Sequence, residues 1–218
     1  PCCGELLHLD GSPHAWLTLC PEEQPTLLHV IDDATKRLLY AQLWPAETTE
    51  AVTIALREVC QTHGLPIALY TDRAGWAFHT PKAGAPVDRS QRTQVGRALA
   101  RLGIEHIPAY SPQARGRSER LNRTLQDRLV NELRLHGATT LAAANAYLRE
   151  RFIADYNATF TRPPADPASA FVPLGAVDLA PILCHEEERT VGQDNTVVLE
   201  GIRLQLAKQP GRRTCAGL

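Results

Sequence analysis

Three acidic residues stand at the ends of predicted elements and could together bind a divalent cation. Asp10 directly follows the predicted strand Gly4–Leu9. Asp72 directly follows the predicted strand Ile67–Thr71, and Glu119 lies on a predicted helix. Hard cations such as Mg²⁺ prefer oxygen ligands, and proteins bind them through a few carboxylates together with substrate phosphates. Two such ions about 3.5–4 Å apart can stabilise both the attacking and the leaving oxygen of a phosphoryl displacement. We therefore expect phosphate-ester chemistry if the fold brings the three carboxylates together.

The helix that carries Glu119 is predicted to be long, basic and amphipathic. It begins either at Pro112 or, because Gly116 interrupts the pattern, near Arg117. Its buried stripe recurs every four residues and comprises Leu121, Leu125, Leu129 and Leu133. Another face comprises Glu119, Asn122, Arg123 and Gln126. Six arginines against three acidic residues between positions 111 and 134 leave a local excess of three positive charges. Such a field suits a phosphate backbone, although an ordinary helix with solvated charges has the same pattern.

Several side chains near Glu119 are candidates for contact with nucleic acid. The net charge of −1 and the isoelectric point of about 6.8 do not exclude this partner, because a local basic stripe can carry the phosphate contacts. The expected contacts are made by Gln113, Arg115, Arg117, Arg120 and Arg123. Asp32 and Asp33 are rival acidic candidates, but they lie in a predicted hairpin connection, where Asp commonly bonds the local backbone. We expect a structural role for both.

The elements that must position these residues alternate in a way that predicts an α/β fold. Three strands come first, followed by helix, strand, helix, strand and two helices, which indicates a mixed sheet with an initial meander and later crossovers. We expect residues 11–13 to turn the chain and strand one to lie beside strand four. The predicted elements are strands 4–9, 26–31, 37–43, 67–71 and 104–108 and helices 48–63, 93–102, 112–134 and 140–156.

The last part of the chain has a different character. Short strands are predicted at Arg189–Val191, Thr196–Leu199 and Arg203–Leu206, and they resemble the start of an incomplete β-module. We therefore expect a core at residues 1–174, a linker at 175–187 and a partial C-terminal β-module at 188–218. The chain contains no Met and begins with Pro1, so we interpret it as a fragment of a longer polypeptide or a translated remnant.

The cysteines and the hydropathy of the sequence give an expectation for where in the cell the protein is located. The six cysteines include no CxxC pair, so neither a zinc knuckle nor a disulfide framework is expected, and reduced thiols in a cytoplasm are favoured. No apolar run is long enough to cross a bilayer, so no membrane partner is expected.

Five sequence motifs, in order, resemble the DDE integrase and transposase catalytic core of the ribonuclease H-like superfamily. The pattern is most similar to insertion-sequence transposases of the ISNCY type. The motifs are Leu9–His14, Ile31–Thr35, Leu69–Arg73, Ser111–Arg120 and Asp155–Asn157 with Arg162–Pro164. The resemblance implies a ribonuclease H-like mixed five-stranded sheet flanked by helices.

The same resemblance implies a function. Asp10, Asp72 and Glu119 would be the catalytic triad, holding two Mg²⁺ ions, with Mn²⁺ as a possible substitute. The activity would be DNA phosphodiester hydrolysis and strand transfer during transposition. The partners would be double-stranded DNA, both transposon ends and target, and further copies of the chain on that DNA. The location would be the bacterial cytoplasm, on the nucleoid when bound to DNA.

Two other functions remain open from the sequence. The amino-terminal helix-turn-helix region of such transposases is not found here, and the terminal β-module looks incomplete. A non-catalytic nucleic-acid-binding remnant of a decayed transposase is therefore one alternative. A ribonuclease H-like nuclease is another, although the Ser111–Arg120 motif favours integration.

Overall fold

The chain forms two compact units, Pro1–Cys184 and His185–Leu218. The structure is a computed structural model that describes residues 1–82, 86–88, 90–110, 112–207, 210–211 and 214–216. For residues 112–120 it describes the backbone and not the side chains.

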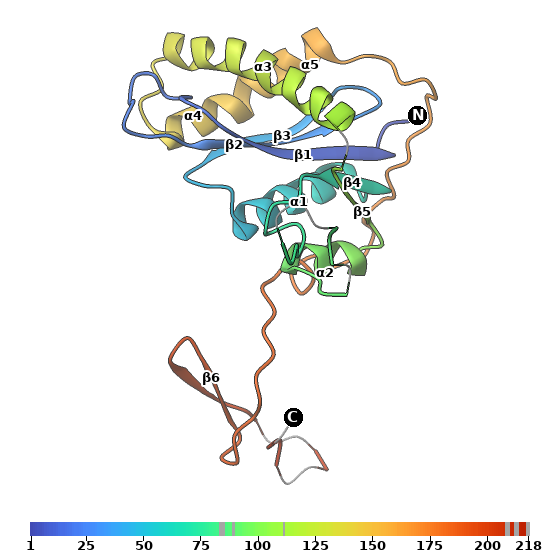
Figure 1. Cartoon of the computed structure of the whole chain (residues 1–218), viewed down its shortest axis with the longest axis vertical. Helices are drawn as coiled ribbons and strands as arrows, with labels where there is room; N and C mark the ends of the chain where they lie inside the picture. Colours follow the sequence, from blue (N-terminus) through green and yellow to red (C-terminus); the bar gives the residue numbers. More distant parts are fainter. Residues whose placement is uncertain (83–85, 89, 111, 208–209, 212–213, 217–218) are drawn as a thin grey trace. The chain divides into compact units, whose positions relative to one another are not determined.

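The first unit is built on a mixed five-stranded sheet, as predicted (Figure 1). The strands are β1 (Leu6–Pro13), β2 (Thr26–Asp32), β3 (Leu38–Trp44), β4 (Ala68–Thr71) and β5 (Glu105–Pro108). Their order across the sheet is β3-β2-β1-β4-β5. The first three strands pair antiparallel, whereas β1, β4 and β5 are parallel to one another. Strand one therefore lies beside strand four, and the arrangement is that of the ribonuclease H-like fold.

The first strand is longer than predicted, and the expected turn at residues 11–13 is wrong. Gly11, Ser12 and Pro13 continue β1 and stand opposite Leu28, Leu27 and Thr26 of β2. The turn signal of Gly, Ser and Pro is local, whereas the antiparallel ladder with the buried strand β2 satisfies the backbone over the full length. Asp10 consequently lies within a strand and not at its end.

Helices cover both faces of the sheet (Figure 1). One face carries α1 (Thr49–His63) and α2 (Gln94–Arg101), and the other carries α3 (Pro112–Leu135), α4 (Leu141–Tyr147) and α5 (Ile153–Phe160). A π-helical turn, η1 (Leu148–Phe152), joins α4 to α5, so the predicted final helix exists and extends to Phe160. The hydroxyls of Thr48, Thr93 and Thr140 cap the starts of α1, α2 and α4. Of the two predicted starts of α3, the structure has Pro112.

The predicted leucine stripe fastens α3 to its face of the sheet. Leu125, Leu129 and Leu133 are fully buried in a cluster with Trp16 and Phe152, and Leu121 is partly buried. This apolar stripe fixes the rotation of the helix, and therefore fixes which side chains the remaining faces present.

Two asparagines attach the last helical segments to the outer strand β3. Asn157 accepts from the backbone N–H of Leu38 at 2.7 Å and donates to its carbonyl at 2.9 Å. Asn145 makes the same pair of bonds with Leu43. The two amides satisfy backbone groups at an exposed sheet edge, so Asn157 of the Asp155–Asn157 motif has a structural role.

The second unit contains a two-stranded antiparallel sheet, β6 (Thr196–Leu199) and β7 (Ile202–Gln205). Glu200 and Gly201 join the strands with positive φ angles of 48° and 79°, as tight hairpins require. The strand predicted at Arg189–Val191 is wrong, because these residues form no ladder.

Part of the expected linker is packed in the first unit, where Leu179 and Leu183 are buried in the core that α1 and α2 share with the sheet. The proposed domain limits at residues 174 and 188 stay predictions. Among the helices described, none is both long and apolar enough to cross a membrane.

Candidate active site

Asp10 and Asp72 lie at the same level of neighbouring parallel strands. The β1–β4 register pairs His8 with Tyr70, and the two aspartates are the second residues after this pair. Because side chains alternate along a strand, both aspartates belong to the face that carries His8 and Tyr70. The ladder between the strands ends at the same place, since β4 stops at Thr71. The two carboxylates therefore lie at the same end of these strands, near enough for the charge of Asp72 to raise the pKa of Asp10.

The two carboxylates differ in environment. Burial and the negative charge of Asp72 raise the pKa of Asp10 to about 6, against the opposing effect of a hydrogen bond from Asn122. Asp72 is exposed, and its Oδ1 accepts a 2.9 Å bond from the backbone N–H of Ala74, which orients it at the end of the strand. A partly buried carboxylate near an exposed one is an arrangement that a cation stabilises.

Helix α3 passes over β1 so that residues four positions apart on the helix bond residues two positions apart on the strand. Asn122 Nδ2 donates to Asp10 Oδ2 at 3.0 Å, and Gln126 Nε2 donates to Ser12 Oγ at 3.1 Å. Four helical residues rise about 6 Å and two strand residues rise about 6.6 Å, so successive turns meet alternate residues of the strand. Glu119 stands one turn before Asn122 on the same helix.

The side chains predicted to complete the site lie largely outside the described part. This holds for Glu119 and for the proposed DNA contacts Gln113, Arg115, Arg117 and Arg120. Arg123 is described and exposed. No cluster of three His, Cys, Asp or Glu side chains suited to a metal ion occurs among those described. The meeting of Glu119 with the two aspartates, and the DNA contacts, stay predictions.

A further carboxylate near Asp10 was not selected from the sequence. Glu47 precedes α1 and is partly buried, and its Oε1 accepts a 2.8 Å bond from Trp76 Nε1. A Cβ placed on Gly11 would overlap the Glu47 carboxylate. Burial, followed by the charges of Asp72 and Asp10, raises the pKa of Glu47, whereas the bond from Trp76 lowers it. Glu47, which lies in the segment before α1, thus contacts both strand β1 and the loop after Asp72.

The sequence signal for Glu47 is weak. An acidic residue beside a helix start ordinarily indicates a favourable interaction with the helix dipole. The glycine after Asp10 is the better clue, because a glycine inside a strand often marks a close approach of another group.

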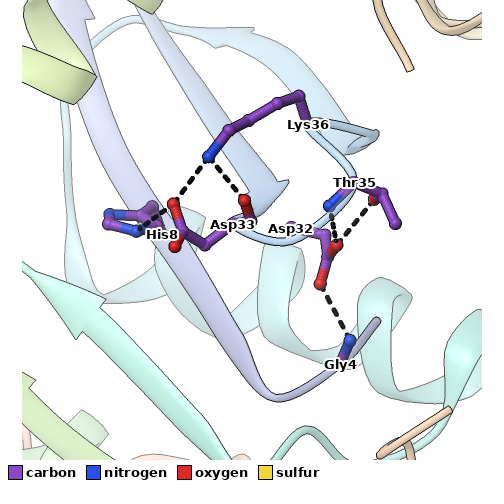
Figure 2. A network of polar contacts seen from close by, with 6 residues as sticks. All are labelled: Gly4, His8, Asp32, Asp33, Thr35 and Lys36. Atoms are coloured by element: carbon purple, nitrogen blue, oxygen red, sulfur yellow. Dashed lines mark hydrogen bonds and ion pairs between the residues drawn. The ribbon is translucent and has the colours of Figure 1, made fainter. Parts of the chain in front are cut away.

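The rival residues Asp32 and Asp33 have local partners (Figure 2). Asp32 is fully buried and accepts from the backbone N–H groups of Gly4 at 2.8 Å and Thr35 at 2.7 Å. Asp33 contacts His8 Nε2 at 3.4 Å and Lys36 Nζ at 2.7 Å, and these partners hold its pKa well below the usual range. Asp32 has the expected structural role, closing the turn between β2 and β3.

No family model matches the chain. A protein named putative transposase y4bF, from Sinorhizobium fredii, is 38% identical over 217 residues, or 98% of this chain. The transposase for insertion sequence IS1202, from Streptococcus pneumoniae, is 38% identical over 158 residues, or 72% of this chain. This chain is a relative of bacterial transposases. It spans 46% and 33% of the lengths of these two relatives.

The solved structures that match the chain include retroviral integrases. A simian T-cell lymphotropic virus intasome in complex with the PP2A regulatory subunit B56 gamma matches with a TM-score of 0.48 and 16% identity. The match covers 69% of the chain described here and 50% of the intasome chain. The HTLV-2 integrase catalytic core domain, in complex with magnesium, matches with a TM-score of 0.47 and 18% identity, covering 67% and 84% respectively.

Proposed function

We propose that this transposase relative performs metal-dependent hydrolysis and strand transfer of DNA phosphodiesters through Asp10, Asp72 and Glu119. The observation that carries the proposal is the placement of Asp10 beside Asp72 at the opening between β1 and β4. Helix α3 lies over this point, held by Asn122, and brings the backbone of Glu119 to the preceding turn. The relatives named as transposases support the same reaction class.

The donor set fits magnesium. Carboxylate oxygens are the ligands that Mg²⁺ prefers, and Mn²⁺ accepts the same set. The pKa of Asp10, which burial and the charge of Asp72 raise to about 6, supports the assignment, because a bound cation would offset the cost of holding two ionised carboxylates near each other. Two bound ions would stabilise the attacking and the leaving oxygens of the phosphodiester.

The residues of the chain provide orientation and charge. The amide of Asn122 fixes one oxygen of Asp10, and the Ala74 N–H fixes one oxygen of Asp72, so neither carboxylate must reorganise when DNA arrives. The arginines of α3 would hold the phosphate backbone in line with a water and then with a DNA 3′-hydroxyl. Positioning of this kind is the main contribution of a protein to phosphoryl transfer.

The proposal includes the partners and the location. The substrate would be double-stranded DNA, with transposon ends and target, and the acting form would be a homo-oligomer assembled on that DNA in the bacterial cytoplasm. The retroviral core that was solved in dimeric and trimeric forms is in keeping with oligomeric action.

Nicking of supercoiled plasmid in Mg²⁺ or Mn²⁺ tests the proposal. Glu119→Gln, Asp10→Asn and Asp72→Asn should each reduce the rate by several orders of magnitude, without adding together, because the carboxylates act as one unit. Asp127→Asn is the matched control, since Asp127 is exposed on the same helix. Wild-type nicking by Glu119→Gln would show that a different carboxylate completes the site. A wild-type chain that binds DNA but does not nick it would favour the binding remnant.

A further inference from the structure

A pocket of about 340 Å³ extends from Asp10 along strands β1 and β2. Its floor consists of two cross-strand pairs, Asp10 opposite His29 and His8 opposite Ile31. Its walls and rim are Leu121 and Thr124 of α3, Tyr156 and Phe160 of α5, and Asp33, Lys36 and Arg162. The volume lies within the range of small-molecule sites, roughly 300–1,000 Å³.

The floor includes His29, whose ring has a buried acceptor nitrogen. His29 is 1% exposed, and its Nδ1 lies 2.8 Å from the backbone carbonyl of Asp10. A carbonyl can only accept, so Nδ1 carries the hydrogen and Nε2 of the neutral ring has a bare lone pair. Among the described residues, no donor reaches the buried Nε2 atom. This atom is therefore an acceptor that an N–H or O–H group could satisfy.

The walls and rim define the rest of the ligand. The rings of Tyr156 and Phe160 pack against each other, 4.8 Å apart by their centroids, and with Ile31 and Leu121 they form an apolar wall on which a planar group could lie. Lys36 and the exposed Arg162 supply positive charge at the rim. Lys36 is already bonded to Asp33 (Figure 2), whereas no ion pair of Arg162 is found in the described part of the chain. A ligand that combines a planar ring, an N–H donor and an anionic group would match the apolar residues, the acceptor nitrogen of His29 and the positive charge at the rim.

We propose that this pocket binds an unpaired nucleotide, with its base against His29 and its phosphate at Arg162 and Lys36. An amino group or ring N–H of the base donates to His29 Nε2, and the aromatic walls hold the ring, as in pockets that receive extruded bases. The nucleotide comes either from a DNA strand that passes Asp10 or from the free pool. The DNA source rests on the proposed function, whereas binding of a mononucleotide does not.

Fluorescence titration with the monophosphate of 2-aminopurine deoxyriboside tests the pocket in buffer containing EDTA. Stacking on aromatic rings should quench the probe saturably in the wild-type chain. Arg162→Ala, which leaves intact the backbone bond from Arg162 to the Thr35 carbonyl, should weaken binding about tenfold. Leu121→Trp, which places a larger side chain in the pocket, should weaken binding at least as much. Arg151→Ala, an exposed arginine outside the pocket, should bind as the wild type does.

A second ligand tests the acceptor without altering the protein. The corresponding purine nucleotide, which lacks the amino group, should bind the wild type about tenfold more weakly in competition with the probe. His29→Leu should remove this difference between the two nucleotides. The absence of saturable binding by the wild type, or wild-type affinity in folded Arg162→Ala and Leu121→Trp chains, would overturn the proposal. Circular dichroism melting establishes that the variants are folded.

A titration with DNA probes decides whether the nucleotide comes from a DNA strand or from the free pool. A duplex with 2-aminopurine in a single-stranded overhang should show the same quenching and the same dependence on Arg162, whereas a fully paired probe should not. Quenching by the mononucleotide alone would assign the pocket to free nucleotides and reject the DNA source. Because EDTA prevents metal-dependent cleavage, the titration can succeed even where the nicking experiment fails, and the two results are distinguishable.

Discussion

Asn122 donates a 3.0 Å hydrogen bond to Asp10, which connects the middle of β1 to helix α3 one turn after Glu119. The bond opposes the effects that raise the pKa of Asp10, namely burial and the charge of Asp72. It therefore has two consequences, one for the position of the helix and one for the charge of the carboxylate.

Asn122→Ala should raise the pKa of Asp10 above about 6, because the substitution removes a bond that favours the ionised form. It should also reduce the free energy of unfolding by about 1 kcal/mol. Carbon-13 NMR titration of the Asp10 carboxyl measures the first effect. Asn131→Ala, on an exposed position of the same helix, is the control. An unchanged Asp10 titration in Asn122→Ala would refute the role of this bond.

The stability of the metal-free protein should fall as the pH rises from about 4 to about 6. The pKa of Asp10 is about 6 in the folded chain and roughly 3.9 in an unfolded one, so the folded state binds more protons in this window. At pH 7 the ionised Asp10 should cost about 2–3 kcal/mol relative to pH 4. Asp10→Asn should therefore stabilise the chain at pH 7 and not at pH 4.

Urea denaturation in EDTA between pH 4 and pH 8 measures this difference. Asp127→Asn should follow the wild-type profile. Parallel profiles of wild type and Asp10→Asn would show that Asp10 is not in the environment that the fold gives it, and added Mg²⁺ should reduce the difference at pH 7 if the cation site is present.

Gly11→Ala should displace the Glu47 carboxylate and break its bond with Trp76. The new methyl group would occupy the space of that carboxylate, and the bond is worth about 1 kcal/mol. In a Glu47→Ala background the same substitution should cost much less, so a double-mutant cycle on unfolding free energy should show coupling. Gly75→Ala, where a Cβ meets nothing within 4 Å, is the control. Additive effects would exclude the contact.

DNA binding by the chain should be salt-sensitive and weakly specific. Each neutralised phosphate contributes about −0.9 to the slope of log affinity against log salt. Replacement of Arg117 and Arg123 with Ala should flatten the slope by up to about two such increments. Fluorescence anisotropy at several salt concentrations measures it. An unchanged slope would show that α3 is not the DNA surface.

The local pattern of the sequence determined the elements and much of their order. The leucines at intervals of four defined the buried stripe of α3, and Thr48 and Gly64 marked the ends of α1, because these signals arise from neighbours in the chain. The pairing of strand one with strand four was also predictable, since the order of strands and crossovers restricts the topology. The motifs around Asp10 and Asp72 selected two aspartates that lie at the same level of the parallel strands β1 and β4, and their catalytic role stays a prediction.

Only the tertiary structure decided the length of β1, the contacts of Asp10 and the place of Glu47. Gly11 to Pro13 have the composition of a turn, but the ladder with β2 provides partners for their backbone that no local signal reveals. Asn122 and Glu47 are separated from Asp10 by 112 and 37 positions, so no periodicity connects them. Their proximity follows from packing of helices on opposite faces of one sheet, and packing depends on the whole core and not on any single segment.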